Sequence, residues 1–327
     1  MENNFSLWQE MPQILKEKKE QRKVAGVAGL SLLALFLIMF GWSFIYVRIM
    51  ENLGFDYSFI IESTKNPAVN ELIQIIVSTF MTIIPSLIFL RATHQKARKV
   101  IGFGKPKMEN KTAYFFAALG FCMAASLFGN FMSNIFASFG LSFPSMEREL
   151  PTGPLGFVLV VLSTAVFPAL LEEFMMRGAV LGVLRKFGDG FAIIASSLVF
   201  AVMHASLIQF AFAFLVGIVL GFVTVKSGSI WMAVLIHAAN NFVSVAFSFL
   251  EIYLGAEDQS VVFYIFLLII FALSMISTVI VSKDKEFLRL EKSKTLATNR
   301  QKLGWFISSP WMIVAICAAV AIAIFLR

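Results

Sequence analysis

The side chains that can do chemistry gather in three apolar stretches of the sequence. They are two carboxylates, a guanidinium, two imidazoles and an amide: Glu172, Glu173, Arg177, His204, His237 and Asn241. Ionisable groups are costly in lipid, so an intramembrane cluster of this kind marks a functional site by default. Proton transfer, metal binding and hydrogen bonding between helices all lie within the chemistry of these groups.

Spacing divides these side chains between helix faces. Glu173 and Arg177 are four residues apart, so on a helix they share a face and can form an ion pair. Such a pair lowers the cost of both charges in lipid. Glu172 is rotated by about 100° from Glu173 and can point elsewhere. His237 and Asn241 are also four apart, which places an imidazole and an amide on one face.

Helix geometry also predicts how deep the groups lie. At about 1.5 Å per residue, Glu172 and His204 lie roughly 20 Å from the cytoplasmic ends of their helices, and His237 lies roughly 12 Å in. Pro168, one turn before Glu172, predicts a kink that opens room for water. We therefore expect one buried site on three helices, nearest the cytoplasmic side at His237.

Each group also has a purely structural interpretation. A lone histidine or Asn241 can hydrogen-bond a neighbouring helix, and an ion pair can hold a bundle together. We favour a functional site because these groups share three helices near one another in sequence. We expect no ionisable residue away from the ends of the other spans.

The composition requires a lipid environment. The chain has 327 residues, of which 58% are hydrophobic and 14% are charged, and its mean hydropathy is +0.82. Soluble domains carry about 25% charged residues, so a soluble globular protein is excluded. The two cysteines, Cys122 and Cys317, both lie in apolar runs, and a disulfide framework has no support.

The elements that must position the site are transmembrane helices. A spanning helix needs about 20 mostly apolar residues. Nine stretches qualify: 24–47, 71–90, 113–139, 155–184, 191–208, 210–225, 230–250, 261–282 and 305–326. The fifth and sixth are nearly fused around Gln209, where we expect a tight turn between two helices. The predicted fold is an all-α, polytopic transmembrane bundle of about eight to nine spans.

Lys and Arg residues predict the orientation. With nine spans, the basic N-terminus and the basic loops after spans two, four, six and eight fall on one side, and the acidic loops fall on the other. The positive-inside rule places the N-terminus in the cytoplasm. A basic rim facing anionic lipid accounts for the net charge of +7 without nucleic acid. We expect an integral protein of a bacterial plasma membrane.

Three motifs carry a family resemblance. EEFMMR at 172–177, FAVMH at 200–204 and HAANN at 237–241 resemble the Glu-Glu-x-x-x-Arg, Phe-x-x-x-His and His-x-x-x-Asn motifs of the CPBP family, in the same order. This is the CAAX-protease and bacteriocin-processing group, also called Abi. The resemblance covers about 155–250. We accordingly divide the chain into a basic N-terminus, spans one to three, a catalytic core and spans eight and nine: 1–23, 24–154, 155–250 and 251–327.

The resemblance implies an intramembrane endopeptidase whose best-known relatives cleave prenylated CAAX proteins. Glu172 would activate water, and His204 would assist it or bind a metal. His237 and Asn241 would stabilise the oxyanion or complete a metal site, while Glu173 and Arg177 would hold the architecture. Burial makes a carboxylate a better proton acceptor near neutral pH, in agreement with the first role.

Zinc at His204 and His237 is one option for a cofactor. Asn is a poor zinc ligand and the sequence lacks His-Glu-x-x-His, so a metal-free water activated by glutamate fits as well. The expected partners are membrane lipids and a peptide or lipid-anchored protein substrate. A non-catalytic immunity or scaffold protein of the same fold is the alternative. A transporter with a proton relay is a third interpretation, which no inverted repeat supports.

Overall fold

The protein folds as a bundle of long helices. The computed structural model describes residues 2–139, 149–284, 289–291 and 295–325, and every regular element within them is a helix. The helices long and apolar enough to cross a membrane are α1 (Glu2–Asn52), α3 (Pro67–Ala92), α5 (Lys111–Ser138), the composite helix Gly153–Phe187, α10 (Leu207–Ser227), α11 (Ile230–Leu254) and α12 (Ala256–Ser282).

An eighth candidate span consists of two helices. α13 (Asn299–Ile307) and α14 (Pro310–Phe325) pass the same test together and are bent by 67° at their junction. Two short helices, α2 (Tyr57–Thr64) and α4 (Ala97–Val100), lie in the connections between spans. The predicted polytopic all-α fold is confirmed.

The fifth predicted span, 191–208, is the short helix α9 (Asp189–Met203). Its 15 residues extend about 22 Å, less than the roughly 30 Å of a bilayer core. Eleven of the 15 are buried, because other helices surround α9 instead of lipid. The tight turn to α10 is present but lies at 204–206, before Gln209. Ala205 there has φ 45°, and the Ser206 hydroxyl caps α10 by accepting from the backbone N–H of Gln209.

The composite helix departs from regular α geometry in three places. It comprises α6 (Gly153–Val160), η1 (Val161–Val166), α7 (Phe167–Glu173), η2 (Phe174–Leu181), α8 (Gly182–Leu184) and η3 (Arg185–Phe187). The first and second η segments are π-helical, and the last is a 3₁₀ turn.

The kink predicted at Pro168 is replaced by the first of these π segments. Pro168 has no N–H to donate to the carbonyl of Thr164, and in an α-helix its ring would clash with that carbonyl. The wider π turn at η1 accommodates the ring while the span continues unbroken from Gly153 to Phe187. π segments of this kind are frequent at functional sites.

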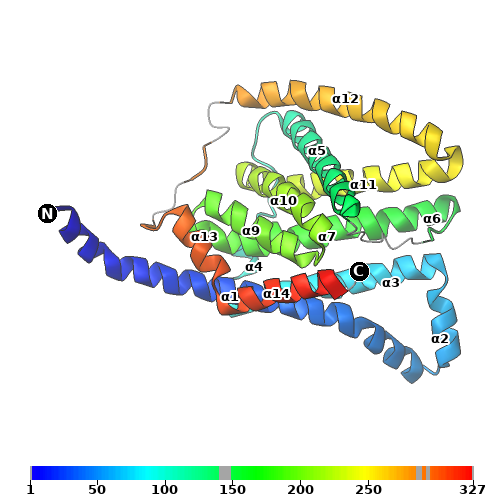
Figure 1. Ribbon diagram of the computed structural model, residues 1–327, viewed down its shortest axis with the longest axis horizontal. Coiled ribbons are helices and arrows are strands. Elements are labelled where there is room, and N and C mark those ends of the chain that lie inside the picture. The colour runs from blue at the N-terminus through cyan, green and yellow to red at the C-terminus, as the bar shows by residue number, and fades with distance from the viewer. Residues whose placement is uncertain (1, 140–148, 285–288, 292–294, 326–327) are drawn as a thin grey trace.

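The helices that carry the predicted site lie in the middle of the bundle (Figure 1). α14 runs beside α1 on one side, and α12 lies beside α5 and α11 on the opposite side. α9 and α10 pack closely because Gly217 has no side chain, and a Cβ there would lie 2.8 Å from the Cβ of Ser197. Small residues allow such close approach between membrane helices.

Candidate functional site

The centre of the site is the fully buried carboxylate of Glu173. Its Oε1 accepts hydrogen bonds from Arg177 Nη1 at 2.7 Å and from His237 Nδ1 at 2.9 Å. Arg177 Nη2 also donates to the backbone carbonyl of Gly217 at 3.3 Å. These contacts connect the composite helix to α11 and to α10. The ion pair that the sequence spacing allows is therefore formed, and it also fixes the orientation of an imidazole.

Glu172 occupies a different environment from its neighbour. Its side chain is 21% exposed, whereas that of Glu173 is 0% exposed. Glu172 Oε2 lies 3.9 Å from His237 Nε2, so the two nitrogens of this imidazole face the two consecutive carboxylates. Glu172 lies outside the Arg177 ion pair and is partly exposed.

His204 ends α9 at the edge of the same site. Its Nδ1 lies 2.7 Å from the carbonyl oxygen of Phe200, which it reaches by donating a proton. The Phe200 ring meets His204 edge-on at 4.8 Å and His237 edge-on at 6.0 Å between ring centroids. The guanidinium of Arg177 lies 4.6 Å from the centroid of that ring. Phe200 thus connects three of the predicted site residues by contact with one aromatic ring.

The amide of Asn241 is held by the π-helical turn. Asn241 Nδ2 donates to the carbonyl of Thr164 at 3.2 Å, and its Oδ1 accepts from Asn240 Nδ2 at 3.4 Å. Thr164 is the residue to which Pro168 has no N–H to donate. An amide nitrogen carries two N–H groups, so one remains to bind a substrate oxygen.

A comparison with protein-family models matches this part of the chain. Residues 154–243 match the family described as "Type II CAAX prenyl endopeptidase Rce1-like". This part of the chain is therefore similar to the Rce1-like family. The family prediction is confirmed, and all three motifs fall within this Rce1-like segment. The comparisons with curated proteins and with solved structures give no match.

The donors of the Rce1-like segment do not gather into a metal site. In the described part of the chain, no three His, Cys, Asp or Glu side chains lie close enough together to hold a metal ion. Both histidines use Nδ1 for protein contacts, and His204 has no recorded hydrogen bond to Glu172 or His237. The two predicted zinc ligands thus lack a third partner, and we derive no step through zinc.

Removal of metal should therefore leave the stability of the protein unchanged. We expect protein treated with a chelator, and shown by elemental analysis to be free of zinc, to unfold at the same temperature as untreated protein. Untreated protein measured for zinc in parallel is the control. A large loss of stability that added zinc restores would establish a zinc site and contradict this expectation.

The sequence interpretation missed one buried carboxylate. Glu71 was expected at the end of a span, but α3 begins at Pro67, capped by Asn66, and places Glu71 inside the bundle with 0% exposure. Ser163 Oγ donates to Glu71 Oε2. The signal was available, since Asn-Pro commonly starts a helix. Glu71 lies outside the Rce1-like segment but contacts the π turn that holds Asn241.

Loss of the Ser163 hydroxyl should destabilise the protein. Ser163→Ala removes a donor from a buried carboxylate oxygen, which costs about 1–3 kcal/mol. Thermal unfolding of the purified protein would measure the effect. Ser86→Ala is the matched control, because the buried Ser86 hydroxyl only donates to a carbonyl of its own helix. Equal effects of the two substitutions would show that the contact with Glu71 contributes nothing special.

Proposed function

We propose that the protein is an intramembrane endopeptidase in which Glu172 activates the hydrolytic water. One observation carries this proposal: two consecutive carboxylates differ in burial and in their hydrogen-bond partners. Glu173 is buried and bound by Arg177 and His237, whereas Glu172 is partly exposed and outside that ion pair. A free carboxylate beside a fixed imidazole is the arrangement that general-base catalysis requires.

The remaining residues support the reaction that follows. Glu172 takes a proton from water, and the hydroxide attacks the carbonyl carbon of the scissile peptide. The second N–H of Asn241 stabilises the oxyanion, and the His237 ring, which Glu173 holds through Nδ1, lies beside it. Glu172 then returns its proton to the leaving amine. His204 is positioned at the rim to hold the water or the substrate.

The substrate class follows from the family and from the membrane setting. The Rce1-like family is described as prenyl endopeptidases of the CAAX type, so we propose a peptide next to a lipid anchor. The basic loops support an orientation with the N-terminus and the access to the site on the cytoplasmic side. Cysteine at Ala238, in a chain lacking Cys122 and Cys317, should react with impermeant thiol reagents in inverted vesicles. Labelling only from the outer side would overturn this orientation.

Cleavage of a defined peptide tests the activity. Purified protein in liposomes should hydrolyse a farnesylated CAAX peptide, with ¹⁸O from labelled water appearing in the new carboxyl group. The same peptide without the farnesyl group is the control for lipid dependence. If neither is cleaved, membrane peptides from cells with and without the protein should reveal another substrate. Identical peptide profiles would favour the non-catalytic immunity or scaffold alternative.

A further inference from the structure

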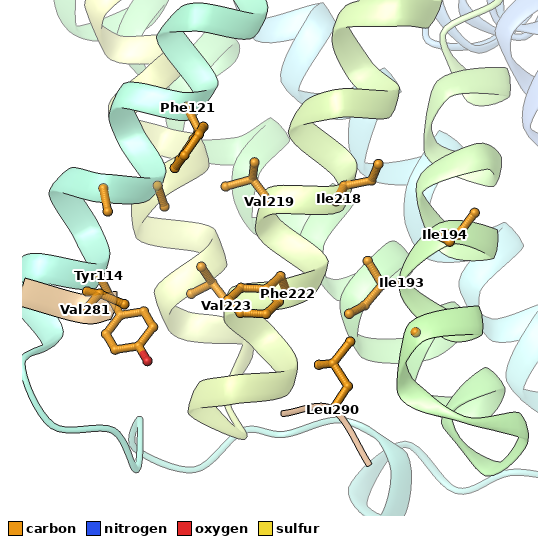
Figure 2. A pocket seen from close by; sticks show the side chains of 13 residues that line it. Tyr114, Phe121, Ile193, Ile194, Ile218, Val219, Phe222, Val223, Val281 and Leu290 are labelled. Atoms are coloured by element: carbon orange, nitrogen blue, oxygen red, sulfur yellow. The ribbon is translucent and has the colours of Figure 1, made fainter. Parts of the chain in front are cut away.

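An apolar groove lies between α5, α9, α10 and the end of α12, away from the catalytic residues. Its volume is about 420 Å³, within the roughly 300–1,000 Å³ typical of small-molecule sites. Figure 2 shows Phe121, Val219 and Ile193 lining it from three helices. Phe121 and Ile194 are 56% and 37% exposed, so the groove opens to the surface of the bundle.

A charged pocket adjoins one end of this groove. It is lined by three basic and two acidic residues with two apolar ones: Arg185, Lys226, Arg289, Asp189, Glu291, Val225 and Leu290. Leu290 also lines the groove, and Gly190 of the groove follows Asp189 of the pocket in the chain. The two hollows are therefore parts of one amphipathic site with an excess of positive charge at one end.

Hydrogen bonds hold residues 289–291, which lie between the groove and the pocket. Lys226 Nζ donates to the carbonyl of Arg289 at 2.8 Å, and the backbone N–H of Asp189 donates to the carbonyl of Glu291 at 3.4 Å. The Asp189 carboxylate accepts from Arg185 Nε at 2.7 Å. These bonds hold residues 289–291 against the ends of α9 and α10, which orders the charged end of the site.

We propose that this site binds one anionic glycerophospholipid. An acyl chain occupies the groove, and the phosphate lies at Lys226 and Arg289. Basic pockets between membrane helices bind acidic headgroups in this way, and charged donors form strong hydrogen bonds to phosphate. The sequence places this end of the helices on the cytoplasmic side, where anionic lipids face the protein.

A second groove shows why charge decides the occupant. It has a volume of about 680 Å³ and lies between α5 and α12, and its lining includes Phe271, Met275 and Val279 but no charged residue. Any acyl chain fits such a surface, and nothing there distinguishes one headgroup from another. The site at Lys226 and Arg289, in contrast, combines an apolar groove with cations.

Lipid binding to the purified full chain tests the proposal. In a neutral detergent, dioleoylphosphatidylglycerol should bind at least tenfold more tightly than dioleoylphosphatidylcholine by native mass spectrometry, and it should raise the melting temperature. Inorganic phosphate should have no such effect, because it lacks the acyl chain. Arg289→Gln should reduce the preference severalfold while keeping the backbone carbonyl that Lys226 binds. Val219→Phe should weaken the binding of both lipids, because the larger side chain fills the groove.

Matched variants separate specific binding from general effects. Lys105→Gln removes an exposed cation elsewhere, and Ile276→Phe fills the uncharged groove, so both should keep the preference for phosphatidylglycerol. If Arg289→Gln fails to purify as a monodisperse protein, Lys226→Arg should retain the preference. Equal binding of the two lipids, or an unchanged preference in Arg289→Gln, would overturn the proposal.

Discussion

Glu172→Gln should abolish proteolysis while the protein remains folded in the membrane. The amide keeps the size of the side chain but cannot take a proton from water. Loss of a general base lowers the rate by about 10²–10⁴-fold. The side chain is partly exposed and lies outside the buried ion pair, so the fold should tolerate the change. Initial rates on the farnesylated peptide, with thermal unfolding of the same preparation, would measure both effects.

A matched substitution distinguishes chemistry from charge. Glu251→Gln removes an exposed carboxylate near the end of α11 and should leave the rate unchanged. Near-normal cleavage by the Glu172→Gln variant would remove Glu172 from the catalytic role. A binding or scaffold protein should likewise tolerate the neutral side chain, so the same measurement separates the two function classes.

Neutralising either Glu173 or Arg177 alone should destabilise the protein strongly. Both side chains are buried and bonded at 2.7 Å, and an unpaired buried charge costs about 3–5 kcal/mol. Arg177→Met leaves the Glu173 carboxylate without its counterion, and Glu173→Gln leaves the guanidinium without its own. The double variant should recover part of the loss. Thermal unfolding and abundance in membranes would show this pattern.

An exposed ion pair supplies the control. Glu62 and Lys65 are also bonded at 2.7 Å, but their side chains are 73% and 66% exposed. Exposed pairs contribute about 0–1 kcal/mol, so Glu62→Gln should change stability little. Single variants of Glu173 and Arg177 that are fully stable but inactive would instead assign the pair to the chemistry.

Local patterns in the sequence predict much of this molecule. Hydropathy identifies the candidate spans because each is a single continuous apolar segment of the sequence. The spacing of four residues predicts the ion pair between Glu173 and Arg177, which the structure contains. The partner of His237 does not follow from spacing. The structure directs Nδ1 to Glu173 and leaves Nε2 facing Glu172. That choice depends on how α11 is rotated against the composite helix.

Features that depend on contacts between distant segments were not predicted. Pro168 indicates an irregularity, but whether the helix kinks or widens depends on its neighbours, including the Asn241 amide on Thr164. Glu71 is read as a span end by hydropathy and becomes interior only when Ser163 lies against it. Residues 289–291 are held against the end of α10 by the hydrogen bond from Lys226, which is distant from them in sequence.

The shortness of α9 has a consequence for hydration. The helix is about 22 Å long, shorter than the apolar core of a bilayer, and the last carbonyls of any helix lack partners in the helix itself. Lipid cannot satisfy such groups. The His204 ring serves one of them, at Phe200, and the turn at 204–206 brings further backbone polar groups to the same depth. A helix too short to cross the apolar core thus leaves backbone polar groups that water can satisfy, at the end of α9 that carries His204.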